Sequence, residues 1–453
     1  MRGRSRAELW SLGKSLRDRC PRRSHAAWKP PHGRPDPVRL LELSNRGRIP
    51  ELVPLRIGRM VRTPFTFYRG AALNMAADLA RTPATGVRVQ ACGDCHLLNF
   101  GDFATPERRV IFDLNDLDET LPAPWEWDLK RLAASLVLAS RYRGFARAVA
   151  RDAARACARA YRERMAEYSE MSALDVWYAR IDVETVLPMI EDRALRRQHK
   201  RRIAKALGRN VREHDFPKLA ALSGRGPRIR ENHPLIYHPA ERAGQDLLAR
   251  SRRAFAAYRQ SLQEDRRVLL DRYELVDVAI KVVGVGSVGT LCAVMLLMAG
   301  AEDPLFLQIK EARASVLEAY AGRSVHPNHG QRVVNGYRLM QSASDLFLGW
   351  ARGELGRHVY VRQLRDVKVG PIVESFSPSV MVRYGEICGW TLARSHARSG
   401  EPATISGYLG RSGVFDEAIA EFSVAYADQT ERDHRALEKA VRSGRVEVMM
   451  EPD

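Results

Sequence analysis

Long apolar runs are missing from this sequence of 453 residues. None reaches the roughly 18–20 residues that a helix needs to cross a bilayer, so no membrane span is expected. The basic segment from Met1 to Arg23 has no continuous apolar core of the kind found in secretory signals, and we therefore predict a cytoplasmic protein. Cysteine is scarce as well, and six residues in so long a chain do not make a disulfide scaffold.

Internal repeats and nucleic-acid-binding signatures are also absent, although the formal net charge is +19. A basic surface favours anionic partners such as phosphorylated molecules, nucleic acid or acidic lipid headgroups. The arginines are spread along the whole chain, however, which is more typical of a solvated surface than of one binding patch. We therefore predict no specific nucleic-acid partner.

Composition and hydrophobic spacing divide the chain into four segments, which suits two lobes or two to three domains. The first is a basic, proline-containing lead-in, expected to be mostly extended with one short helix near Arg39–Glu42. The second is mostly helical and contains two short strands, the third is rich in strands, and the fourth is helical and is expected to pack on the second. In order, the segments are residues 1–50, 51–270, 271–370 and 371–453.

The two short strands, Val87–Ala91 and Arg109–Leu114, flank a loop that contains Asp94 and Asn99. Phosphoryl transfer needs a carboxylate to accept the proton of the attacking hydroxyl and oxygen ligands to hold magnesium. Asp94 suits the first task and Asn99 the second. A further metal-binding carboxylate is available on the next strand as Asp113, with Asp116 as an alternative or second ligand.

The same loop contains Cys92-Gly93-Asp94-Cys95-His96, which matches the pattern for covalent haem attachment. Such attachment normally needs export, for which the sequence carries no signal. A zinc site would need a second pair of ligands, and the other cysteines are isolated. Neither cofactor is therefore expected.

A glycine-rich segment, Gly284-x-Gly286-Ser287-x-Gly289, has two interpretations. As a dinucleotide fingerprint it would be followed by a helix, with Glu311 on the ribose, and would indicate an NAD- or FAD-dependent oxidoreductase. As a phosphate-covering loop it would join two antiparallel strands, with Lys310 on a third strand binding the phosphates. A glutamate would orient this lysine, and Glu318 is a better candidate than Glu311. The second interpretation also accounts for Lys310 and the Asp94 loop, so it is preferred.

The Asp94 loop resembles the catalytic core of the protein-kinase-like superfamily, in particular its aminoglycoside and choline phosphotransferase branch. The matching positions are Gly93, Asp94, His96, Asn99, Asp113 and the pair Asp128-Leu129. In that superfamily the glycine loop and lysine precede the catalytic loop, whereas here they follow it. The resemblance therefore implies an α+β, bilobal fold with circularly permuted chain order, a small β-rich lobe and a larger helical lobe.

The whole chain, from about Gly13 to Gly444, is also similar to the bacterial family called domain of unknown function 2252. The resemblance is carried by several runs, among them Pro64 to Gly70, Gly93 to Gly101, Phe112 to Glu119, Gly284 to Thr290 and Gln308 to Ala312. That family implies a chain that folds as one unit, and no established activity.

These features together favour a kinase-like phosphotransferase that uses ATP and Mg²⁺. Its substrate would be a hydroxyl-bearing small molecule or protein. An alternative is a pseudokinase-like nucleotide-binding regulatory module with the same fold and little or no turnover. The oxidoreductase remains a third alternative, which a helix directly after Gly289 would support.

Overall fold

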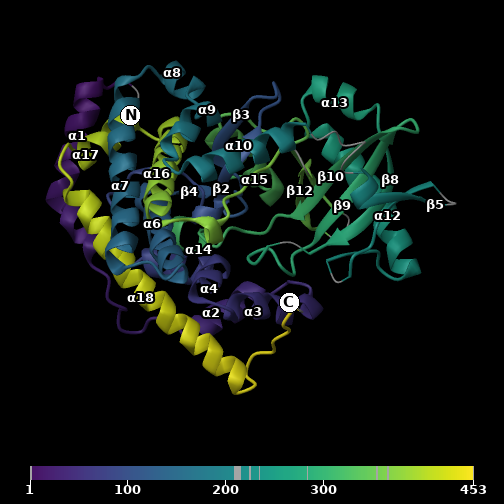
Figure 1. Ribbon diagram of the computed structural model, residues 1–453, viewed down its shortest axis with the longest axis horizontal. Helices are drawn as coiled ribbons and strands as arrows, with labels where there is room; N and C mark the ends of the chain where they lie inside the picture. Colours follow the sequence, from purple (N-terminus) through teal and green to yellow (C-terminus); the bar gives the residue numbers. More distant parts are fainter. Residues whose placement is uncertain are drawn as a thin grey trace.

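The computed structural model describes residues 3–208, 216–223, 226–233, 235–282, 284–353, 356–364 and 367–451. The fold is of the α+β class, as the sequence predicts. A large helical part and a part built around an antiparallel sheet lie side by side (Figure 1). No helix in these described ranges is long and apolar enough to span a bilayer.

The helical part takes its elements from both halves of the chain, and its core is built by α6, α7, α16 and α18. Its helices are α1 (Arg6–Arg19), α2 (Pro37–Asn45), α3 (Val53–Val61), α4 (Pro64–Gly70), α5 (Ala72–Leu79), α6 (Trp125–Tyr142), α7 (Arg147–Glu170), α8 (Ala173–Tyr178), α9 (Val183–Val186), α10 (Arg193–Leu207), α16 (Pro378–Ser399), α17 (Pro402–Leu409) and α18 (Val414–Arg442), with 3₁₀ turns η1 (Arg22–Ala26), η2 (Pro50–Leu52), η3 (Leu97–Asn99), η4 (Leu187–Met189) and η6 (Val373–Ser375). The C-terminal helices therefore pack on the helices that follow the Asp94 loop.

Two short antiparallel strand pairs lie inside the helical part and frame the Asp94 loop. Strand β1 (Arg88–Ala91) pairs with β4 (Leu121–Pro124), and β2 (Phe100–Ala104) pairs with β3 (Val110–Leu114). All residues of β2 and β3 are buried. The loop after β1 is consequently held between two rigid pairs.

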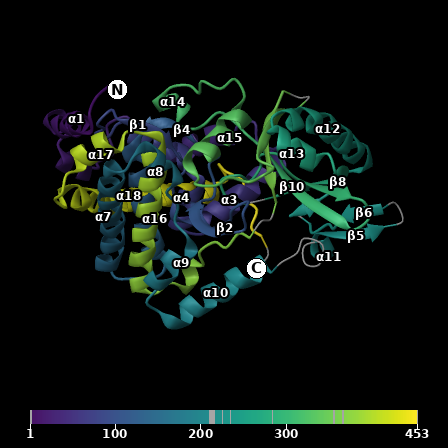
Figure 2. The ribbon, with the colours of Figure 1, turned by 90° about the horizontal axis from the view of Figure 1, so that it is seen from above.

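The sheet part is a six-stranded antiparallel sheet in the order β11-β12-β10-β9-β8-β7. The apolar face packed on helix α12 and the opposite face, covered by the β5–β6 hairpin, make two separate cores (Figure 2). Its elements are α11 (Phe216–Leu219), β5 (Ala220–Ser223), β6 (Gly226–Ile229), β7 (Ile236–Tyr237), α12 (Glu241–Gln260), α13 (Glu264–Leu270), β8 (Glu274–Lys281), β9 (Cys292–Ala299), β10 (Asp303–Glu311), α14 (Glu318–Ala321), α15 (His329–Met340), β11 (Gly349–Arg352) and β12 (His358–Gln363).

The expectation of a mostly extended segment over residues 1–50 is wrong. Helix α1 forms there with a capping box, in which Ser5 and Glu8 satisfy each other's backbone N–H groups. It packs closely on α17, because a Cβ atom at Gly13 would lie 2.0 Å from the carbonyl oxygen of Thr404. Close backbone approach, rather than a wide apolar stripe, holds this helix, which explains why its polar sequence gave little signal.

Helix α15 joins the two parts. Its buried Arg332 donates to the carbonyl oxygens of Asp118, at 2.9 Å, and Thr120, both in the connection between β3 and β4. The same guanidinium donates to the carbonyl oxygen of Arg313 after β10, at 2.8 Å. Hydrogen bonds from one side chain to both parts fix the end of β10 relative to the Asp94 loop.

Buried His25 makes the stability of the fold sensitive to acid. Burial, followed by the charge of Lys130, lowers the pKa of His25 to about 2. Since the unfolded value is about 6.5, this contribution to stability is present at neutral pH and is lost as the pH falls below that value. Between pH 7 and pH 5 the free energy of unfolding should fall by about 2 kcal/mol through His25 alone. Denaturant unfolding of His25→Gln should show a shallower fall, whereas His32→Gln, at an exposed histidine, should behave as wild type; equal slopes would contradict this assignment.

Candidate functional site

Helix α6 holds the backbone of the Asp94 loop through the side chain of Asp128. The carboxylate of Asp128, in the first turn of α6, accepts hydrogen bonds from the backbone N–H groups of Cys92 at 2.5 Å and Gly93 at 2.9 Å. It also faces Nε2 of His396 at 3.2 Å. Asp128 is 1% exposed, so its charge is held by these donors rather than by water. The clamp fixes the backbone that carries Asp94.

One carboxylate oxygen of Asp94 accepts hydrogen bonds from Arg131, and the other faces the glycine loop. Its Oδ1 atom accepts from Nε of Arg131 at 2.8 Å, with a second contact from Nη2 of the same side chain. Its Oδ2 atom faces the glycine loop, 3.9 Å from the position of a Cβ atom on Gly286. Asn99 donates its Nδ2 hydrogen to the carbonyl oxygen of Asp94 at 2.6 Å, which leaves its own Oδ1 available as an acceptor or metal ligand.

Asp113 is placed away from this site. Its carboxylate is fully buried and contacts Nη2 of Arg394, also fully buried, at 2.5 Å. The other oxygen accepts from the backbone N–H and the hydroxyl of Ser342, each at 2.9 Å. With every oxygen occupied, Asp113 holds α16 and the segment after α15 on strand β3. Of the two predicted metal-binding carboxylates, Asp116 is the one that lines the cavity described below.

Lys310, at the end of β10, pairs with the β3–β4 connection. Its Nζ atom lies 2.6 Å from Asp118 and 3.7 Å from Asp116, and Tyr360 donates its hydroxyl to Asp118. Burial and then the charge of Asp118 raise the pKa of Asp116. Burial acts in the same direction on Asp118, but Lys310 outweighs it and lowers the pKa of that carboxyl. The Lys310–Asp118 ion pair thus fixes the ammonium group of Lys310 beside the carboxylates of Asp116 and Asp118.

Neither predicted glutamate orients Lys310. Glu318 lies 3.8 Å from Nδ1 of His329, and Glu311 accepts from the backbone N–H of Leu291 and from Arg357. The sequence-based assignment missed Asp118, although it stands in the same acidic run as Asp116. The only signal for Asp118 in the sequence was its position, two residues after the metal-ligand candidate Asp116.

The glycine segment joins antiparallel strands β8 and β9. Gly284 and Gly289 adopt positive φ angles of 65° and 83°, which glycine tolerates best. Gly286 comes close to the helical part, since a Cβ atom there would lie 3.3 Å from the carbonyl oxygen of Arg69. A strand, not a helix, follows Gly289, so the helix that the dinucleotide-binding alternative requires is not there.

A cavity of about 600 Å³ lies where these segments meet. It brings together Asp94, Asn99 and Asp116 with Gly284, Gly286 and Ser287, and its lining also includes His96, Asn115, Asp118, Glu119, Arg362 and Lys368. Gly289 stands at the base of the glycine loop, next to Thr290 in the wall. Four predicted site residues do not line it: Asp113, Glu318, Gly289 and Lys310. Lys310 instead contacts the wall through Asp116 and Asp118.

The donor set in this cavity fits magnesium only in combination with a ligand. In the ranges that the structure describes, no group of three or more His, Cys, Asp or Glu side chains could hold a metal ion by itself. Magnesium is commonly bound by one or two carboxylates, with substrate phosphates and water completing its octahedron. Asp116 and Oδ1 of Asn99 suit that role, and Asp118 is already paired with Lys310.

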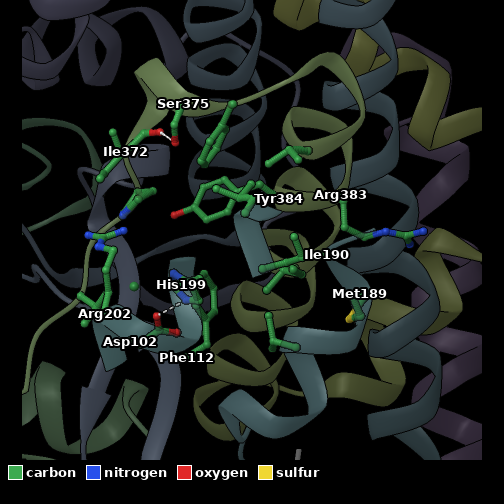
Figure 3. Close-up of a pocket in the computed structure, with 18 of the residues that line it drawn as sticks. Asp102, Phe112, Met189, Ile190, His199, Arg202, Ile372, Ser375, Arg383 and Tyr384 are labelled. Carbon is green, nitrogen blue, oxygen red and sulfur yellow. Dashed lines mark hydrogen bonds and ion pairs between the residues drawn. The ribbon is translucent and has the colours of Figure 1, made fainter. Parts of the chain in front are cut away.

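A second, smaller pocket lies beside strand β2, which follows the Asp94 loop, and its walls are mostly apolar (Figure 3). Tyr384 points across it and donates its hydroxyl to the carbonyl oxygens of Leu97 at 2.9 Å and Phe100 at 3.3 Å. On another wall, Nε2 of His199 lies 2.8 Å from the Asp102 carboxylate (Figure 3). Tyr384 therefore holds the segment that carries Asn99 through the carbonyl groups on either side of it.

The sequence of the chain matches one family of bacterial proteins over most of its length. The model of the family described as an uncharacterized protein conserved in bacteria, DUF2252, matches residues 48–440. The chain belongs to the DUF2252 family. The match to DUF2252 begins after α1 and α2 and includes every residue that lines the cavity except two further lining residues, Leu43 and Ser44. No curated protein and no solved structure matches the chain closely enough to extend the comparison.

Proposed function

We propose that this protein transfers a phosphoryl group from ATP to a hydroxyl-bearing substrate with the help of Mg²⁺. The observation that carries the proposal is the convergence of the Asp94–Asn99 loop, Asp116 and the glycine loop on one cavity, with Lys310 beside Asp116 in its wall. These segments lie far apart in the chain, and phosphoryl transfer uses this combination of groups. The cavity is within the range of about 300–1,000 Å³ typical of ligand sites.

In the proposed reaction, Asp94 accepts the proton of the substrate hydroxyl through its free Oδ2 atom. The hydroxyl oxygen forms a bond to the γ-phosphorus, the bond from that phosphorus to the β–γ bridging oxygen breaks, and ADP leaves. Lys310 stabilises the negative charge of the phosphates, and the backbone N–H groups of the glycine loop cover them. Asp116 and Asn99 would hold the magnesium ion, which neutralises phosphate charge when bound.

The proposal includes a kinase-like fold with circularly permuted chain order. A glycine loop between two antiparallel strands, followed by a lysine on the third strand, corresponds to the protein-kinase pattern. In this chain β8, β9 and β10 supply that pattern after the catalytic-loop segment instead of before it. The clamp of Asp128 on the loop agrees with the Asp-Leu pair that the phosphotransferase branch carries.

The pseudokinase-like module is the second candidate, and one observation favours it. A Cβ atom on Gly286 would lie 3.9 Å from Oδ2 of Asp94, so a terminal phosphate and a hydroxyl cannot both stand between them until the loop moves. A binding module would not need that movement. Hydrolysis of ATP or autophosphorylation by the wild-type protein, lost in Asp94→Asn, would favour the enzyme.

Nucleotide binding gives the first test. Calorimetry on the full chain should detect ATP binding that requires magnesium, and Lys310→Met should weaken it by about tenfold or more, equivalent to at least ~1.4 kcal/mol. Lys281→Met, at a lysine on β8 that does not line the cavity, is the matched control and should bind as wild type. Absence of magnesium-dependent ATP binding in a folded wild-type protein would refute the proposal.

A further inference from the structure

Besides Arg362, the cavity is lined by four arginines that the reaction above does not use. They are Arg48, Arg56 and Arg69 from the segments around α2, α3 and α4, and Arg313 from the segment after β10. Three of them are fastened by backbone carbonyls. Arg48 donates to Val288 at 2.6 Å, Arg56 to Gly70 at 2.7 Å, and Arg313 to Ser44 at 3.4 Å.

None of these four guanidinium groups forms an ion pair with a carboxylate in the described part of the chain. Three acidic groups of the cavity wall have other ionic partners: Asp94 pairs with Arg131, Asp118 with Lys310, and Glu311 with Arg357. Glu119 also lines the wall and accepts from the backbone N–H of Val316, and its charge acts on Arg48 and Arg56 without an ion pair. The positive charge of the four guanidinium groups is therefore compensated only in part by the protein. Buried charges are normally paired, because an unpaired one loses its hydration without replacement.

Burial makes this imbalance costly at Arg56. Its side chain is only 1% exposed, and its Nε atom is buried with no hydrogen-bond partner. Nε of Arg69 is likewise buried without a partner. Burial, followed by the charge of Arg313, lowers the pKa of Arg48 to about 10. Burial and then the charges of Arg48 and Arg313 lower the pKa of Arg56 well below its usual range. The guanidinium groups of Arg48, Arg56 and Arg313 thus lie close enough to repel one another, and a bound anion would relieve this repulsion.

We propose that Arg48, Arg56, Arg69 and Arg313 form a subsite for a phosphate group on the acceptor. This inference rests on the proposed function and names the substrate class: a small molecule that carries a phosphate as well as the hydroxyl to be phosphorylated. Guanidinium groups match the charge and planar geometry that phosphate oxygens need. A protein acceptor without such a group would leave the four guanidinium groups without an ion-pair partner.

The position of the subsite favours the acceptor over the nucleotide. The nucleotide phosphates belong beside Lys310, Asp116 and the inner side of the glycine loop. Arg48 and Arg69 lie instead where the glycine loop meets the helical part, since Arg48 donates to Val288 and the carbonyl oxygen of Arg69 approaches Gly286. An acceptor phosphate held there would leave its hydroxyl on the Asp94 side of the loop.

Inorganic phosphate is the probe for this subsite. By calorimetry at low salt, the full-length protein should bind it without nucleotide or magnesium, and added salt should weaken binding. Arg69→Gln and Arg313→Gln should each lower the affinity by about tenfold, as expected for loss of charge-assisted hydrogen bonds. Arg46→Gln removes an exposed arginine of the same segment and should leave the affinity unchanged. No binding, or equal loss in all three variants, would overturn the subsite.

Competition separates the two sources of phosphate. Saturation with magnesium and a non-hydrolysable ATP analogue should leave the binding of inorganic phosphate intact if the arginines serve the acceptor. Full displacement would assign them to the nucleotide and overturn the inference, while the proposed phosphotransferase would stand. If the protein binds inorganic phosphate at the arginines but no nucleotide, the proposed function fails and the assignment to an acceptor fails with it, leaving only an anion site.

Discussion

Turnover in Asp94→Asn should fall by about 10²–10⁴-fold, the usual contribution of a general base, while ATP binding stays close to that of wild type. Asparagine can still accept the hydrogen bond from Arg131 through its side-chain oxygen, but it cannot take up the substrate proton. Steady-state phosphorylation or ATP hydrolysis gives the rate, and calorimetry gives the affinity. The result depends on one carboxylate oxygen being free, as Oδ2 of Asp94 is.

The control is a carboxylate elsewhere in the fold. Asp175, exposed on α8, can be changed to asparagine and should leave both the rate and the affinity unchanged. A melting temperature of Asp94→Asn near that of wild type would show that the loop stays folded. Equal turnover in wild type and Asp94→Asn would remove Asp94 from the reaction and favour the binding module.

Asp113→Asn should destabilise the fold by about 3–5 kcal/mol, because it leaves Arg394 charged and unpaired in a fully buried site. Asp116→Asn should cost far less stability. Its side chain is 36% exposed, Lys310 keeps Asp118 as its closer partner, and the repulsion between Asp116 and Asp118 is relieved. Denaturant unfolding of the two variants measures the difference.

The same two variants separate structure from metal binding. Asp116→Asn should remain folded and lose the magnesium dependence of ATP binding, whereas any folded fraction of Asp113→Asn should keep it. The assignment of the two carboxylates would be reversed if Asp113→Asn were the stable variant with the metal defect. A double change, Asp113→Asn with Arg394→Met, removes both charges and should recover part of the lost stability.

Local patterns predicted the parts of the site that are local in sequence. Asp94 and Asn99 are five residues apart between two strands, so one loop places both at the cavity. The apolar run Leu291–Met298 was ambiguous between helix and strand, and the presence of Lys310 on a following strand correctly favoured the strand. The predicted segment boundary at residue 271 lies inside the sheet part, because β7 already pairs with β8 and α12 packs on the same sheet.

The rest of the site depends on contacts that no local pattern encodes. The choice between Asp113 and Asp116 is made by Arg394 on α16, and the partner of Lys310 is Asp118 rather than the helix glutamate Glu318. Both outcomes follow from how distant segments pack. The cluster of unpaired arginines could not be predicted either, because the sequence does not say which of many arginines lack a carboxylate. The kinase-like description of the fold stays a prediction.

The ion pair between Asp113 and Arg394 also sets the timing of folding in the cell. The two residues are 281 positions apart, and a ribosome adds about 5–20 residues per second. Arg394 is therefore synthesised roughly 14–56 s after Asp113. During that time the β2–β3 pair cannot be buried with its charge compensated, so the Asp94 loop above it has no fixed support. The site can form only after nearly the whole chain has been translated, and a nascent chain truncated before α16 should show none of its binding.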